Sequence, residues 1–137
     1  MDQLNSYQTA CIIAGIIDEK KASDIVILDI SKVSIMADYF VICSTETSTQ
    51  LRTLSEHIIY DLKHNFQRIT KSEQKDLSDK WYLLDYGDVI VHVLHQEARE
   101  YYAIEKFWSH AFVVEENKWK EEYNHSVECK AEMETNK

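Results

Sequence analysis

The chain has 137 residues, of which 45% are hydrophobic and 28% are charged, as in an ordinary globular protein. It contains two glycines, Gly15 and Gly87, and no proline, so the glycine-rich phosphate loops of Rossmann and P-loop proteins are excluded. The formal net charge of −9 disfavours direct contact with nucleic acid and favours a basic protein as partner.

The first half of the chain is expected to form a helix, two strands and a second helix. Apolar residues three and four positions apart over 4–17 predict an amphipathic helix. The β-branched runs at 25–30 and 39–43 predict strands that are covered on both faces. Thr47 and Gln50 have the spacing of a capping box, which predicts that the second helix begins there.

The second half is expected to form three strands and a last helix. Residues 66–70 predict a weak strand. Two aromatic and β-branched runs, 81–85 and 89–95, flank a turn at Gly87 and predict a β-hairpin. Residues 97–112 predict a helix with one apolar side. The order α-β-β-α-β-β-β-α indicates an α/β fold (α+β mixed), with a mixed five-stranded sheet flanked by helices.

One domain is expected over residues 1–114, followed by a charged tail over 115–137. The tail has seven acidic residues and four lysines with little hydrophobic periodicity, so we expect a frayed helix or a disordered segment.

The three cysteines are widely spaced, which predicts buried or incidental thiols in a reducing compartment rather than disulfides or a metal site. No apolar run approaches the roughly 18 residues of a membrane span, and the start of the chain lacks the features of a signal peptide. A cytoplasmic location is therefore expected.

The hairpin region is similar to a known family. It reads WYLLDYGDVIVHV at 81–93 and, with the segments around it, closely resembles the ribosomal silencing factor (Iojap) family. The resemblance covers about residues 5–112, and its segments are 24–28, 37–44, 81–93, 97–102 and 104–108. Thr45 and Gln74 stand where family members usually carry glycine, a departure that bears on the local loop conformation because glycine alone adopts positive φ freely.

This resemblance implies a function. The chain would bind the large ribosomal subunit through ribosomal protein L-fourteen and sterically block joining of the small subunit, which slows translation in starvation or stationary phase. The resemblance also implies a nucleotidyltransferase-like fold without that chemistry and a homodimer of the free factor. No cofactor and no metal are expected. Neither nucleic acid as the main contact nor a membrane is expected.

Candidate residues for binding the partner surround the hairpin turn. Trp81 and Leu83 share one face of their strand by the period of two, and an exposed tryptophan is a strong interface anchor, although a core position is the alternative. Asp85, Tyr86 and Asp88 flank the turn. Ordinary turn chemistry explains them as well as charge-assisted hydrogen bonds to a basic partner do.

The remaining candidates lie in the second hairpin strand and the last helix. His92 either contacts the partner or makes a structural hydrogen bond, and its spacing from His95 places the two rings on opposite faces, which argues against a metal site. Glu97 favours a helix N-terminus. Arg99 pairs internally or contacts the partner, and Tyr102 follows in the same helix.

Two other functions are considered. A nucleotidyltransferase would need two carboxylates one residue apart on a strand, whereas Asp85 and Asp88 stand three apart across a turn, so catalysis is not expected. A dimeric adaptor for another basic protein is the second alternative.

Overall fold

The computed structural model describes residues 4–135, with side chains described for residues 4–131. Its elements are α1 (Ser6–Glu19), β1 (Ser23–Asp29), β2 (Tyr39–Thr45), α2 (Ser48–Phe66), β3 (Ser72–Lys75), β4 (Trp81–Asp85), β5 (Val89–His95), α3 (Gln96–Tyr102), α4 (Ile104–Phe107), β6 (Phe112–Val114) and α5 (Glu116–Thr135). The strands form one mixed sheet in the order β3-β4-β5-β2-β1-β6. The pair β2–β5 is parallel, and the other four pairs are antiparallel. The expected mixed α/β architecture is confirmed.

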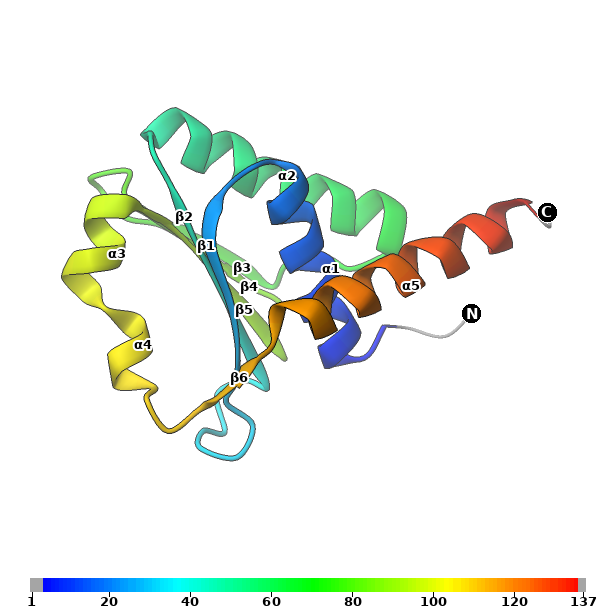
Figure 1. Ribbon diagram of the computed structural model, residues 1–137. Helices are drawn as coiled ribbons and strands as arrows, with labels where there is room; N and C mark the ends of the chain where they lie inside the picture. Colours follow the sequence, from blue (N-terminus) through cyan, green and yellow to red (C-terminus); the bar gives the residue numbers. More distant parts are fainter. Residues whose placement is uncertain (1–3, 136–137) are drawn as a thin grey trace.

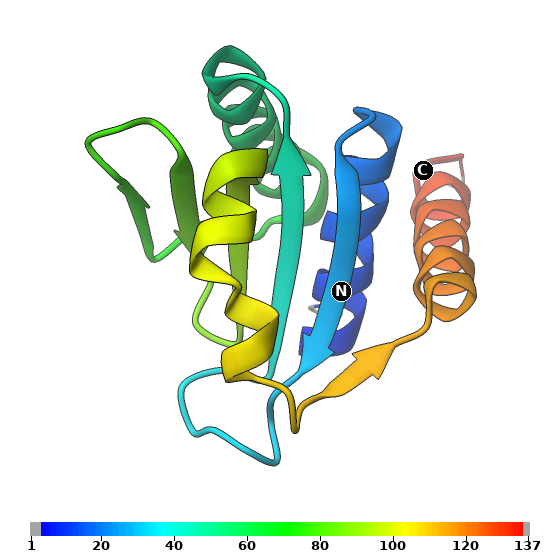
Figure 2. The ribbon, with the colours of Figure 1, turned by 60° about the vertical axis from the view of Figure 1, so that its left-hand side comes forward.

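Helices cover the two faces of the sheet unequally, as Figures 1 and 2 show. The back face, which carries Val41 and Val91, packs against α1, α2 and α5 and contains the larger core. The front face, which carries Phe40 and Leu94, packs against the shorter helices α3 and α4. In Figure 2, α3 and α4 lie in front of the middle of the sheet, and the strands β3 and β4 extend beyond them.

The elements with strong hydrophobic patterns form where the sequence predicts them. The hairpin β4–β5 closes through a turn in which Gly87 has φ 90°, a conformation that glycine adopts without steric cost. Helix α2 begins after Thr47, whose hydroxyl accepts a hydrogen bond from the Gln50 backbone N–H at 3.0 Å, as the capping spacing predicts. Thr45 and Gln74 lie within strands, whose extended backbone suits any residue.

The prediction of five strands was wrong, because the sheet has six. The expected strand at 66–70 is absent from the described structure: Phe66 ends α2, and Gln67 caps the helix in the left-handed conformation with φ 54°. The strand that precedes β4 in the chain and pairs with it is instead β3, all of whose residues are exposed. An exposed edge strand needs no apolar side chains, so hydrophobic patterning gave no signal for it.

The prediction of one helix over 97–112 was also wrong. Helix α3 ends at Tyr102, Ala103 takes φ 46°, and α4 continues only to Phe107. The chain then forms the sixth strand, β6, which pairs antiparallel with β1 at the edge of the sheet.

The charged C-terminal segment differs from the expectation of a frayed or disordered tail. It forms the 20-residue helix α5, which packs alongside α1. Trp119 is 2% exposed and belongs to the back-face core. A Cβ atom at Gly15 would overlap the ring of Tyr123, so this glycine of α1 permits the close approach of α5. The Tyr123 hydroxyl donates a hydrogen bond to Glu19 Oε1 at 2.6 Å.

The predicted domain begins at residue 1 and the predicted tail ends at residue 137. Residues 1–3 and 136–137 lie outside the described part of the chain. Within residues 4–135, none of the helices combines the length and apolar composition that a membrane crossing requires.

Candidate interaction site

Alternation along β4 separates its side chains between the two faces of the sheet. Trp81 and Leu83 are half-buried and pack at the margin of the front-face core, whereas Leu84 is fully buried in the back face. Leu83 lies opposite His92 on β5, and Trp81 lies opposite Leu94. The expectation that Trp81 and Leu83 share a face is confirmed.

Aromatic side chains extend the exposed surface from β4 onto α3. The ring centroids of Trp81 and Tyr102 are 4.7 Å apart, and those of Tyr102 and Tyr101 are 5.0 Å apart in an edge-to-face contact. Tyr101 is 81% exposed and Tyr102 is 42% exposed. We call Trp81, Leu83, Tyr101 and Tyr102 the front-face patch. The sequence did not single out Tyr101 for this surface, because its exposure depends on where α3 ends.

A shallow cavity borders the front-face patch. Its volume is about 290 Å³, and its lining residues are Asp76, Ser78, Lys80, Glu97, Ala98, Tyr101 and Tyr102. The Lys80 ammonium contacts the Glu97 carboxylate at 2.6 Å, and this ion pair holds the pKa of Glu97 below its ordinary value. Glu97 thus lies beside the patch with both ends of the ion pair open to solvent.

His92 lies beneath the patch rather than on it. Its side chain is 5% exposed and makes an edge-to-face contact with Phe40 at 4.6 Å between ring centroids. His92 Nδ1 accepts a hydrogen bond from the Trp81 indole N–H at 3.2 Å. Burial lowers the pKa of His92 from 6.5 to about 4, so the ring is neutral near neutral pH. Of the two expected roles for His92, the structural hydrogen bond is observed.

The turn of the hairpin uses its polar groups internally. The Asp85 carboxylate accepts a hydrogen bond from the Gly87 backbone N–H at 2.7 Å, which is ordinary turn chemistry. Tyr86 is 3% exposed and lies in the back-face core, where burial raises the pKa of its hydroxyl. Among the described residues, the Tyr86 hydroxyl has no hydrogen-bond partner. In this conformation Tyr86 has little surface to offer a partner.

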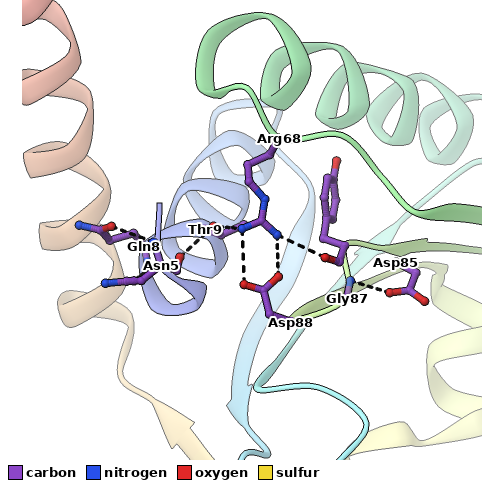
Figure 3. A network of polar contacts seen from close by, with 8 residues as sticks. Asn5, Gln8, Thr9, Arg68, Asp85, Gly87 and Asp88 are labelled. Atoms are coloured by element: carbon purple, nitrogen blue, oxygen red, sulfur yellow. Dashed lines mark hydrogen bonds and ion pairs between the residues drawn. The ribbon is translucent and has the colours of Figure 1, made fainter. Parts of the chain in front are cut away.

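Arg68 connects the turn to helix α1, as Figure 3 shows. Its guanidinium contacts both carboxylate oxygens of Asp88, at 2.6 and 3.4 Å. It also donates to the Tyr86 carbonyl oxygen and to the Thr9 hydroxyl, each at 3.3 Å. Arg68 lies in the loop after α2, and no pattern in the sequence marks it as part of the turn. Asp88 is engaged in this internal ion pair.

Arg99 is likewise paired inside the protein. Its guanidinium forms a two-pronged contact with Glu105, at 3.0 and 2.9 Å, and donates to the Ser44 hydroxyl at 2.9 Å. Its side chain is 10% exposed. Arg99 therefore ties α3 to α4 and to the end of β2, the internal alternative of the two considered from the sequence.

The structure thus brings Trp81, Leu83, Glu97 and Tyr102 to one surface, and it places the other candidates in the core, in the turn or in internal ion pairs. Within the described side chains, no group of three or more histidine, cysteine, aspartate or glutamate residues is arranged to hold a metal ion.

Replacing His92 with phenylalanine should reduce the sensitivity of the fold to acid. Below about pH 6.5 the unfolded chain takes up a proton at His92, whereas the folded protein does so only near pH 4. Wild-type protein therefore loses about 2 to 3 kcal/mol of unfolding free energy between pH 7 and about pH 4.5 that the variant keeps. Urea denaturation at both pH values measures this difference. The exposed His110 provides the control His110→Phe, and equal losses in all three proteins would contradict the prediction.

Comparison with known proteins finds a matching family model and similar relatives. Residues 3–137 match the family model described as "Ribosomal silencing factor during starvation". The chain is 37% identical over 108 residues to ribosomal silencing factor RsfS of Bacillus subtilis, which covers 79% of this chain and 91% of the relative.

A mouse relative and a solved structure are also similar. The mouse protein is named "Mitochondrial assembly of ribosomal large subunit protein 1" and is 29% identical over 101 residues, covering 72% of this chain and 44% of that protein. A crystal structure of a Chromobacterium violaceum protein superposes with a TM-score of 0.73 at 25% identity, covering 77% of this chain and 88% of that chain.

Proposed function

The chain belongs to the ribosomal silencing factor family, whose members are ribosome-associated regulators of translation, and on this premise we propose that it binds the large ribosomal subunit through ribosomal protein L-fourteen. Bound there, it would sterically block joining of the small subunit and so slow translation in starvation or stationary phase. We place this activity in the cytoplasm.

The observation that carries the proposed surface is the exposure of aromatic side chains on the front-face patch. The ring of Trp81 packs against the tilted ring of Tyr102, and Tyr101 beside them is 81% exposed. Tryptophan and tyrosine are enriched among the residues that dominate binding energy, because they bury a large area at low entropic cost. Leu83 and the Lys80–Glu97 ion pair surround this centre.

The charge of the chain supports a protein partner. A net charge of −9 repels the phosphates of ribosomal RNA, so a basic ribosomal protein is the better electrostatic match. The same negative charge would also suit a dimeric adaptor that binds another basic protein. A pull-down from a mixture of purified ribosomal proteins, with and without L-fourteen, separates these two functions.

We propose that the activity is steric rather than catalytic. The carboxylates that a nucleotidyltransferase would use are engaged in structure, since Asp85 stabilises the turn and Asp88 contacts Arg68. Asp76 accepts hydrogen bonds from the backbone N–H groups of Lys80 and Trp81. The likeness of the fold to nucleotidyltransferases stays a prediction. Saturable binding of ATP or CTP with magnesium that is lost in Asp85→Asn would support the enzyme instead.

The homodimer of the free factor is also part of the proposal. Phe107 and Phe112 are 84% and 70% exposed, and such apolar side chains favour association between copies. Light scattering on the purified chain measures its mass, and a monomer at all concentrations would contradict the dimer without bearing on ribosome binding.

The double variant Trp81→Ala/Tyr101→Ala should lose the ability to keep subunits apart. Removing two aromatic anchors should weaken binding to isolated large subunits by about 30-fold or more. Sucrose-gradient sedimentation of large and small subunits mixed with the protein measures joining, and co-sedimentation with large subunits alone measures binding. Tyr60→Ala is the control, because Tyr60 is 61% exposed on α2, at the back of the sheet.

Two outcomes would count against the proposal. If wild-type protein neither binds large subunits nor prevents joining, the function is wrong. If the double variant acts like wild type, the function stands and the front-face patch is not the binding surface.

A further inference from the structure

His92 occupies a position where a polar side chain carries a cost. The ring is 5% exposed, and its Nε2 atom has no hydrogen-bond partner among the described residues. An unpaired buried N–H group destabilises a fold, whereas phenylalanine would fill a similar volume without that cost. The polar contact that the structure gives to His92 is the one at Nδ1, which accepts the hydrogen bond from Trp81.

This hydrogen bond determines how the indole of Trp81 lies. The indole N–H can only donate, so His92 Nδ1 must be the unprotonated nitrogen and Nε2 must carry the proton. On its other side, the Trp81 ring packs against Tyr102. Phe40 in turn packs against the imidazole and holds it in place. The anchor of the front-face patch is therefore fixed between a buried acceptor and an exposed aromatic ring.

The acceptor is available under ordinary conditions. Because burial keeps the imidazole neutral down to acidic pH, Nδ1 stays unprotonated and can accept from Trp81. A binding surface that is already held in its bound conformation avoids the entropic cost of ordering side chains on association.

We propose that His92 is a positioning residue for the partner-binding surface: from beneath the sheet surface it fixes the orientation of the Trp81 indole through the Nδ1 hydrogen bond and does not itself contact the partner. The inference rests on the proposed function, since it concerns the same surface. It also explains why a histidine with an unpaired N–H occupies a core position.

Three variants separate positioning from stability. His92→Phe keeps an aromatic ring but removes the acceptor, and it should bind large subunits about fivefold more weakly while melting at the wild-type temperature or above. His92→Asn places an amide group near the position of Nδ1, and it should restore binding to within about twofold of wild type. In a Trp81→Phe background, His92→Phe should cause no further loss, because the two residues act through one hydrogen bond.

The indole N–H signal of Trp81 in a proton–nitrogen correlation spectrum reports on the same contact without any ribosome. Its assignment follows from the signal lost in Trp81→Phe. The signal should move upfield and exchange faster with solvent in His92→Phe, and His92→Asn should return it toward the wild-type position.

Each outcome has one meaning. Wild-type binding by a folded His92→Phe variant, or additive losses from the two substitutions, would overturn the positioning role. An unchanged indole signal in His92→Phe would overturn the hydrogen bond itself. If wild-type protein fails to bind large subunits while the indole signal responds as expected, the proposed function fails and the contact between the two side chains stands.

Discussion

Replacing Trp119 with alanine should lower the free energy of unfolding by about 3 to 5 kcal/mol, the range measured for large aromatic residues removed from cores. Trp119 is 2% exposed and joins α5 to the core on the back face of the sheet. Its loss leaves a cavity that neighbouring aliphatic side chains fill only in part. Urea denaturation followed by circular dichroism measures the change.

Glu121→Ala is the matched control on the same helix, because Glu121 is exposed and its removal should change stability by less than about 0.5 kcal/mol. A loss below about 1 kcal/mol in Trp119→Ala would mean that α5 is not packed on the domain. In that case the expectation of a frayed or disordered tail would be right.

Arg68→Met should cost about 2 to 3 kcal/mol of unfolding free energy, the second large effect. The substitution keeps most of the aliphatic side chain but leaves the Asp88 carboxylate and the Tyr86 carbonyl oxygen without their guanidinium partner. The Arg68 and Asp88 side chains are 17% and 31% exposed, so water can restore only part of what is lost. Arg52→Met, at an exposed position of α2, is the control and should be nearly neutral.

A double-mutant cycle tests whether the ion pair is the cause. Once Asp88→Asn has removed the carboxylate charge, Arg68→Met should cost at least about 1 kcal/mol less than it does in wild-type protein. If the two substitutions are additive, the ion pair between Arg68 and Asp88 contributes little to the free energy of unfolding. Arg68 then stabilises the fold through its contacts with Thr9 and Tyr86.

The sequence predicted those elements in which apolar residues recur with the period of a helix or a strand. The helices α1 and α2 and the hairpin β4–β5 follow from the spacing of apolar residues. The sequence did not predict β3 and β6, which lie at the two edges of the sheet. An edge strand forms backbone hydrogen bonds with one neighbouring strand, and the local sequence does not reveal that neighbour. The break at Ala103 falls on the residue type with the highest helix propensity, so local preference predicts no break there. The contact between Arg99 and Glu105, which joins α3 to α4 across the break, has no sequence pattern either.

The candidate site was predictable only where alternation decides which face a side chain occupies. Trp81 and Leu83 follow directly from the period of two. The same alternation places Tyr86 on the face of Tyr82 and Leu84, and this pattern indicates that Tyr86 is buried. Its position beside the turn instead suggested an exposed residue. The contact between His92 and Trp81 depends on the hairpin register, and Arg68 reaches Asp88 across 20 residues. Neither contact has a sequence pattern.

The pairing of α1 with α5 predicts an order of folding. Gly15 and Tyr123 meet across most of the chain, and closing so long a loop is entropically slow. The hairpin that carries Trp81 closes through a short turn and needs no such search. During synthesis from the N-terminus, α1 can pack on β1, β2 and α2 once these have formed, but the side of α1 that carries Gly15 stays uncovered until α5 has been made. We therefore expect the hairpin of the recognition surface to form early and the packing of α5 on the opposite side of the sheet to come last.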